Sequence, residues 1–302
     1  MHPYIDYLTT FDRRILRYGI WRCNRHIRQG SVILTSGRSE FMEKYLETIA
    51  DLNQRGFDVY SFDWRGQGLS SRLLANRHKG FVHAYDDYVR DLAFFMDEVV
   101  RLAAWPRILM GHSMGGHIIL RYLHDCPRAV RQAILISPMI DVNTAPFPRP
   151  VARFLTRQAL RDGRQYAYAT GYGDYRHPDE KSFRRNKLTS DFRRFMIERD
   201  AVEKNPNLAL GGVTYGWLAA TFDSVEILRQ PGYGARIQTP VLMVSAGNDR
   251  VVSACAQKKF CLDLPRGRRV EIPGACHEIL QETDDIRSIF WRVFDQFTRK
   301  NA

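Results

Sequence analysis

One serine in this sequence has neighbours whose spacing suits nucleophilic chemistry. The letters GHSMG at residues 111–115 follow an apolar run, ILM at 108–110, and precede a segment of helical pattern at 117–124. A GxSxG motif between a strand and a helix predicts a sharp turn that exposes the serine hydroxyl, because only small residues fit beside it. We predict that Ser113 is the nucleophile of an acyl transfer. The alternative is a tight turn whose serine only caps a helix.

A serine hydroxyl is a poor nucleophile at neutral pH, so Ser113 needs a histidine to remove its proton. When a serine lies between a strand and a helix in this way, the order along the chain is the serine, then the acid, then the histidine. Three of the four later histidines fall on the helix after the serine or in a segment without clear strands: His117, His124 and His177. We therefore predict that His277, in a loop after a strand at 269–272, is the base. A buried structural histidine is the alternative.

The acid that orients this histidine is expected at the end of another strand. Asp249 follows an apolar strand at 241–245 through a short loop and precedes His277 by 28 residues. Asp141 follows a strand that ends at Ser137, and a carboxylate at that position could also reach the histidine. We predict Asp249 as the acid and keep Asp141 as the alternative.

Backbone N–H groups near Ser113 are required to stabilise the charge that develops on a substrate oxygen. The turn itself offers the N–H of Met114, at the start of the following helix. The loop SGRS at 36–39, which leaves a strand at 31–35, is where a second N–H is expected, and we assign it to Arg38. The Arg38 side chain is also a candidate for contact with an anionic substrate.

Short apolar runs alternate with helical patterns, which predicts an α/β fold with a mostly parallel sheet. The predicted strands are 31–35, 58–62, 107–110, 133–137, 241–245 and 269–272. A helix capped by Asp86 or Asp87 leads to the strand before Ser113. The loop DWRGQGLS at 63–70 lacks the GKS/T ending of a phosphate-binding loop, and we interpret it as support for the site.

This alternation stops between residues 146 and 231, where prolines, glycines, arginines and tyrosines increase. We predict a helical cap at 146–231, inserted into a core formed by 1–145 and 232–302. Residues 149–194 hold 12 basic and 5 acidic side chains, so this segment carries +7 of the net charge of +12. Such an excess favours contact with an anionic membrane surface, and a solvated basic surface is the alternative. The candidates for that contact are Arg184, Arg185, Arg193 and Arg194.

The composition, with 44% hydrophobic and 26% charged residues, is typical of a globular protein. No stretch reaches the ~18–20 apolar residues that are required to cross a bilayer, and the first residues lack the pattern of a secretory signal. The five cysteines form no CxxC pair, which suits a reduced compartment. We expect a cytoplasmic protein that contacts the inner face of the membrane peripherally.

Several segments together resemble the monoacylglycerol lipase-like serine hydrolases, and the bacterial lysophospholipases of that group most of all. They are SGRSEFMEKY at 36–45, FDWRGQGLS at 62–70, GHSMGG at 111–116, GGVTYGWL at 211–218, AGNDRVV at 246–252 and GACHEILQE at 274–282. The resemblance implies the α/β-hydrolase fold, a cap over the active site and cofactor-free hydrolysis of esters with one fatty acyl chain. It also implies a triad and an oxyanion hole at matching positions: Ser113, Asp249 and His277, and the backbones of Arg38 and Met114.

One departure from the family pattern is Ser36-Gly37, where many relatives carry His-Gly. This puts loop support and substrate preference in question more than catalysis, because the donor is a backbone group. Apolar cap residues are candidates for an acyl-chain site, with ordinary core as the alternative: Phe147, Phe154, Leu155, Leu160, Tyr166, Tyr168, Trp217 and Leu218.

Other functions stay open besides hydrolysis of a monoacyl lipid. A general carboxylesterase or a small serine aminopeptidase would use the same triad, and a non-catalytic receptor could share the fold. We expect a lipid ester as the small-molecule partner and no metal or cofactor. No nucleic-acid partner is expected, because no recognition motif accompanies the positive charge.

Overall fold

The computed structural model describes residues 3–144 and 147–300 and is built around one eight-stranded sheet in the order β1-β2-β4-β3-β5-β6-β7-β8. The strands are β1 (Tyr4–Thr9), β2 (Ile15–Trp21), β3 (Gly30–Thr35), β4 (Phe57–Phe62), β5 (Arg107–His112), β6 (Gln132–Ile136), β7 (Val241–Ala246) and β8 (Gly267–Ile272). From β3 to β8 neighbouring strands pair in parallel, whereas β2 is antiparallel to both β1 and β4. The predicted α/β fold with a mostly parallel sheet is confirmed.

Burial explains which strands the sequence reveals. Every residue of β3, β4, β6 and β7 is buried, because helices cover both faces of the sheet, and such strands read as continuous apolar runs. All six predicted strands are present, with ends that differ by one or two residues. The hairpin of β1 and β2 was not predicted, since its burial alternates and β1 is largely exposed at the edge of the sheet.

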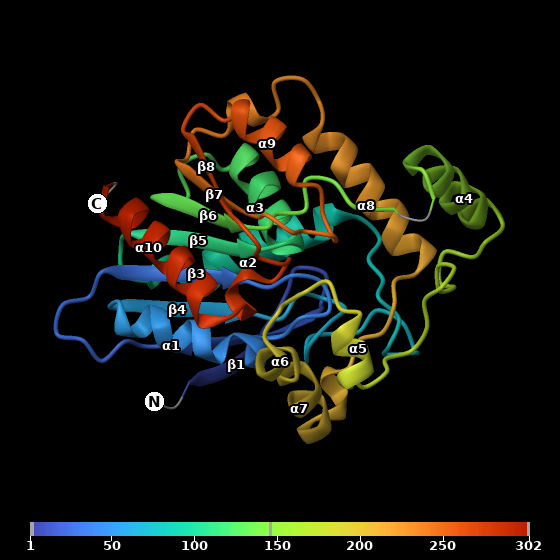
Figure 1. The fold of residues 1–302 in the computed structure, drawn as a ribbon, viewed down its shortest axis with the longest axis horizontal. Helices are drawn as coiled ribbons and strands as arrows, with labels where there is room; N and C mark the ends of the chain where they lie inside the picture. The colour runs from blue at the N-terminus through green and yellow to red at the C-terminus, as the bar shows by residue number, and fades with distance from the viewer. Residues whose placement is uncertain (1–2, 145–146, 301–302) are drawn as a thin grey trace.

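Ten α-helices lie along the described chain: α1 (Leu46–Gln54), α2 (Tyr85–Glu98), α3 (Met114–Asp125), α4 (Arg149–Arg161), α5 (Glu180–Arg184), α6 (Phe192–Phe195), α7 (Ile197–Lys204), α8 (Tyr215–Leu228), α9 (Ala254–Leu262) and α10 (Asp284–Lys300). One face of the sheet packs against α1 and α10, and the other packs against α2, α3 and α9 (Figure 1). None of the helices in the described part of the chain has the length and apolar composition that a membrane span requires.

The prediction that the side chain of Asp86 or Asp87 caps the start of α2 was wrong. The helix begins after Ala84, whose side chain makes no capping hydrogen bond, and both Asp86 and Asp87 lie inside the first turn. Carboxylates in that turn still interact favourably with the positive end of the helix dipole, so the acidic pair marks the helix start without capping it.

Between β6 and β7 the chain forms α4 to α8, and no strand of the sheet lies in the described part of this segment. Figure 1 shows α5, α6 and α7 grouped beside the sheet, with α4 at the periphery next to α8. Isolated bridges join Tyr168 to Thr214 and Gly80 to Val213. The predicted start of the cap at residue 146 lies outside the described residues, and its division from the core stays a prediction.

Arg194 does not lie on a free basic surface, contrary to its place among the candidates for membrane contact. Its side chain is only 3% exposed and forms ion pairs with Glu47, Asp191 and Asp284 at 2.7, 3.1 and 2.5 Å. It also donates to the carbonyl of Glu282 at 2.7 Å. Arg194 therefore joins α6 to α1 and to the start of α10, which is a structural role.

Replacing Arg194 by glutamine is expected to lower the free energy of unfolding by about 2–3 kcal/mol, because several carboxylates lose a charged donor. Urea unfolding at neutral pH measures this loss. Arg193→Gln is the matched control, since Arg193 is exposed and precedes Arg194 in the same helix. Equal effects of the two substitutions would contradict the structural role of Arg194.

Candidate active site

Ser113 lies in a sharp turn between β5 and α3. Its backbone has φ 50° and ψ −112°, a conformation that residues other than glycine seldom adopt and that costs roughly 1–3 kcal/mol. The Ser113 N–H donates to the carbonyl of Ile136 at 2.9 Å, and the Ser113 carbonyl accepts from the N–H groups of His117 and Met139 at 3.1 and 3.0 Å. These bonds hold the serine in its strained conformation, as a nucleophile elbow requires.

Glycines after Ser113 permit close contact with neighbouring loops. A Cβ atom on Gly115 would lie 2.6 Å from the carbonyl oxygen of Ser36, and one on Gly116 would lie 2.9 Å from Cβ of Pro138. Any side chain at Gly115 would therefore push the loop after β3 away from the start of α3. The motif places a serine, a helix start and a second loop within contact distance.

The structure brings the three residues of the predicted triad together. The Ser113 hydroxyl lies 2.9 Å from Nε2 of His277, and Nδ1 of His277 lies 2.8 Å from Oδ2 of Asp249. All three follow the carboxyl ends of parallel strands, which meet at one edge of the sheet. With Nδ1–H donating to Asp249, Nε2 of His277 is free to accept the proton of Ser113.

The surroundings of Asp249 favour its ionised form. Burial alone would raise its pKa, but the hydrogen bond from His277 and those from the N–H groups of Val251 and Val252 bring the pKa below its usual value. The alternative acid, Asp141, instead pairs with Arg149 at 2.5 Å and with Arg229 at 3.5 Å. The geometry therefore favours Asp249.

Within the described part of the chain, none of the other late histidines hydrogen-bonds the Ser113 hydroxyl. His117 is buried and bonds the carbonyl of Met139 and the hydroxyl of Ser224, both at 2.7 Å, and burial lowers the pKa of His117 to about 3. His124 stacks on Tyr233. His177 is exposed in the segment between α4 and α5.

The loop after β3 presents its backbone beside the start of α3. Neither the Arg38 nor the Met114 N–H has a hydrogen-bond acceptor among the described residues, so both can donate to a bound oxyanion. The segment 63–70 supports this loop as predicted, since Trp64 donates to the Ser36 carbonyl at 2.9 Å and Gln67 donates to the Gly37 carbonyl at 2.8 Å.

The side chain of Arg38 is held by the segment that leads into α8. Its Nη2 donates to the carbonyl of Gly211, its Nη1 donates to Ser39 at 2.6 Å, and its guanidinium lies 5.6 Å from the ring centre of Trp217. Its Nε is buried and has no acceptor among the described residues. Arg38 thus connects the candidate oxyanion loop to residues 211–217.

The sequence reasoning missed Glu40, a buried carboxylate at the centre of the site. Glu40 Oε2 accepts from the N–H of Gly37, from the hydroxyl of Tyr45 at 2.5 Å and from Nδ1 of His112 at 3.1 Å. Burial would raise its pKa, but the charges of His112 and Lys44 hold that pKa well below the usual range. The only available signal was an acidic residue in the loop SGRSEF at 36–41, which leads into the short helix Met42–Tyr45.

His112 extends this network to the loop that carries His277. Burial lowers the pKa of His112, yet the neighbouring Glu40 carboxylate brings it above its usual value. The protonated ring donates from Nε2 to the backbone carbonyl of His277 at 3.2 Å. On the other side of Glu40, buried Lys44 pairs at 2.6 Å with Glu278, the residue after His277. Glu40, His112, Lys44 and Glu278 therefore tie the two loops together, and we call these four residues the buried charge network.

Comparison with known proteins shows which family this chain belongs to. The model of the family described as "Serine aminopeptidase, S33" matches residues 26–284. Lysophospholipase L2 of Escherichia coli (strain K12) is 34% identical, over 97% of this chain and 87% of that protein. A probable lysophospholipase L2 of Haemophilus influenzae is 30% identical, over 85% of this chain and 79% of that protein.

A solved structure of another protein has the same fold. A soluble variant of monoglyceride lipase from Saccharomyces cerevisiae, in complex with a substrate analog, matches with a TM-score of 0.77 over 100% of this chain and 96% of that one, at 22% identity. The sheet, its order and the serine elbow define an α/β-hydrolase. The chain belongs to the α/β-hydrolase family of the bacterial lysophospholipases and monoacylglycerol lipases, as the motifs indicated.

The raised pKa of His112 predicts how the stability of the buried charge network depends on pH. Because the pKa in the folded state exceeds the unfolded value of about 6.5, the contribution of His112 is fully present below that pH. It is lost as the pH rises through the folded pKa. His112→Asn should therefore lower the free energy of unfolding by about 2 kcal/mol near pH 6 and by less near pH 9.

Urea unfolding of the parent and the variant at both pH values measures this difference. His124→Asn is the control, since Asp125, which is exposed, is the only carboxylate that His124 contacts among the described residues. A penalty for His112→Asn that stays constant or grows towards pH 9 would show that folding does not raise the pKa of His112.

Proposed function

We propose that this enzyme hydrolyses the carboxylic ester of a monoacyl lipid through Ser113, His277 and Asp249. The observation that carries the proposal is the continuous pair of hydrogen bonds from Ser113 through His277 to Asp249, 2.9 and 2.8 Å long. Hydrolysis of lipid esters agrees with membership of this family. The individual roles below are supported by geometry and by the chemistry of each group.

In the first half of the reaction, the Ser113 oxygen attacks the ester carbonyl while Nε2 of His277 takes the serine proton. The carbonyl oxygen gains negative charge, and the N–H groups of Arg38 and Met114 stabilise it at the start of α3. Asp249 holds the imidazole in the required tautomer and stabilises the imidazolium that forms. The tetrahedral intermediate then collapses, and His277 protonates the departing alcohol.

The product of this half-reaction is an ester between Ser113 and the fatty acyl group. In the second half, His277 removes a proton from water, and the resulting nucleophile attacks the acyl carbonyl in the same oxyanion hole. Collapse of the second intermediate releases the fatty acid and returns the proton to Ser113. No metal or cofactor takes part in this scheme.

We propose that the substrate is a lysophospholipid or a monoacylglycerol. Two curated relatives carry the names lysophospholipase L2 and monoacylglycerol lipase, and the chain aligns with them over most of its length. The segment 146–231 would act as the cap over Ser113, with Trp217 beside Arg38 as one wall of the entrance. Four of the predicted acyl-site residues are instead solvent-exposed: Phe147, Phe154, Leu155 and Tyr166.

We also propose that the enzyme meets its substrate at an anionic lipid surface, on the inner face of the membrane. The excess positive charge of residues 149–194 supports this contact. Arg184, Arg185 and Arg193 remain exposed candidates, whereas Arg194 is excluded by its ion pairs.

A substrate panel tests the proposed reaction. The purified protein should hydrolyse lysophosphatidylcholine or monoacylglycerol fastest, a short nitrophenyl ester more slowly, and a peptide amide not at all. Ser113→Ala should lower kcat by roughly 10⁴-fold to 10⁶-fold with unchanged thermal unfolding, because only the nucleophile is lost. Preference for the amide would favour an aminopeptidase, and full activity of Ser113→Ala would refute the mechanism.

The identity of the acid is tested by paired substitutions. Asp249→Asn should lower kcat by about 10²-fold to 10⁴-fold, because the amide holds the wrong tautomer of His277 while it still accepts from Val251 and Val252. Asp141→Asn removes a carboxylate of equal charge and should change kcat severalfold at most. Steady-state rates on a soluble short ester decide between them, and a larger loss for Asp141→Asn would reverse the assignment.

A further inference from the structure

A hollow of about 710 Å³ lies between α4 and α8, outside the site described above. Its lining is dominated by arginine: Arg149, Arg153, Arg157, Arg161 and Arg229, with Glu226, Pro150, Phe154 and Gln158. Neither the reaction nor the buried charge network uses these side chains. The hollow is therefore a second cluster of charged side chains, separate from the candidate active site.

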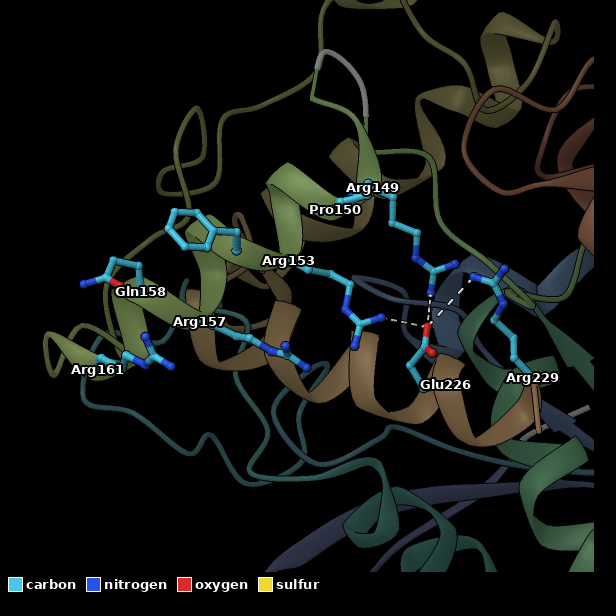
Figure 2. A pocket seen from close by; sticks show the side chains of 9 residues that line it. Arg149, Pro150, Arg153, Arg157, Gln158, Arg161, Glu226 and Arg229 are labelled. Atoms are coloured by element: carbon cyan, nitrogen blue, oxygen red, sulfur yellow. Dashed lines mark hydrogen bonds and ion pairs between the residues drawn. The ribbon is translucent and has the colours of Figure 1, made fainter.

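The spacing of the arginines along α4 is regular. They occur at every fourth position from Arg149 to Arg161, and four residues advance about 40° beyond one full turn of an α-helix. The guanidinium groups therefore form a nearly straight row that turns slowly from the α8 side of α4 towards solvent. Figure 2 shows Arg149, Arg153 and Arg157 extending from α4 towards α8, with Arg229 on the far side of the hollow.

Most of this positive charge is not neutralised within the protein. Glu226 accepts from Arg149 at 2.9 Å and from Arg153 at 3.0 Å, and lies 3.9 Å from Arg229 (Figure 2). Arg157 and Arg161 are exposed and form no ion pair within the described residues. Five guanidinium groups against Glu226 and the adjacent Asp141 leave an excess of three positive charges.

The outward side of α4 is apolar. Val151, Phe154 and Leu155 are 42%, 63% and 43% exposed, and they lie beside the arginine row on the same helix. The opposite side of the helix buries Thr156 and Ala159. A helix with exposed apolar residues next to a row of arginines has the pattern of helices that lie in the plane of a membrane surface.

We infer that α4 docks on an anionic bilayer and that the α4–α8 hollow binds phosphate groups of its lipids. The planar guanidinium fork binds phosphate oxygens in a bidentate manner, and Arg157 and Arg161 have donors available for it. Val151, Phe154 and Leu155 would enter the interface beside the phosphates. Nucleic acid also offers phosphates, but its backbone offers no counterpart for these apolar side chains.

This inference rests on the membrane contact proposed above. It assigns that contact to α4 and the α4–α8 hollow instead of to the whole basic segment 149–194. It does not depend on which ester is hydrolysed. The outermost arginines of the row are the best residues to test, because their exposed side chains form no ion pair within residues 3–144 and 147–300 and their loss should leave the fold intact.

The experiment measures sedimentation of the full-length protein with vesicles of phosphatidylcholine, with and without phosphatidylglycerol. The parent should bind only the vesicles that contain phosphatidylglycerol, and high salt should release it. The double variant Arg157→Gln, Arg161→Gln should bind about 25-fold more weakly, since each arginine near an anionic surface contributes about fivefold. Arg184→Gln, Arg185→Gln is the matched control, with the same change of charge at exposed positions on and just after α5, and should bind like the parent.

The outcomes separate the alternatives. Equal weakening by both double variants would show that net charge alone binds the vesicles, and no weakening by Arg157→Gln, Arg161→Gln would exclude the hollow. Binding of the parent to duplex DNA but not to vesicles would identify nucleic acid as the partner. Each of these results overturns the inference, and none affects the substrate panel, which tests hydrolysis separately. Thermal unfolding of every variant verifies the fold.

Discussion

The Glu40 carboxylate is buried among groups that converge on it from three directions. It accepts from the Gly37 N–H, and so fixes the loop whose next residue is the candidate oxyanion donor. It keeps the His112 ring charged, and that ring holds the backbone of His277. It also shares Lys44 with Glu278. A buried ion is costly unless it is fully paired, so this arrangement is stable only when both loops are in place.

This constraint explains how loops that are distant in sequence reach a common geometry. The loop after β3 and the loop after β8 leave strands that are not neighbours in the sheet, and β5, β6 and β7 lie between them. Strand pairing alone therefore leaves the distance between the two loops free to vary. His112, at the end of β5 and just before Ser113, bridges part of this gap by contacting both loops.

Much of the fold and of the candidate site could be predicted from the sequence, for identifiable reasons. Buried parallel strands leave continuous apolar runs in the sequence, so the central sheet could be predicted. The GxSxG motif requires glycines where loops approach closely, so Ser113 could be predicted as well. His277 and Asp249 could be chosen because each follows such a strand. The β1 and β2 hairpin has no comparable signal at an exposed edge. Glu40 and Arg194 could not be recognised either, because their roles come from partners far away in the chain.

The position of Arg38 has a mechanical consequence. Its backbone is the candidate donor to the reacting oxygen, whereas its side chain holds the Gly211 carbonyl and stacks against Trp217. A displacement of residues 211–217 away from Arg38 must break these contacts and release the guanidinium. The backbone of the loop would keep its bonds to Glu40 and Gln67, so movement of this segment changes the charge facing the site without displacing the candidate donor.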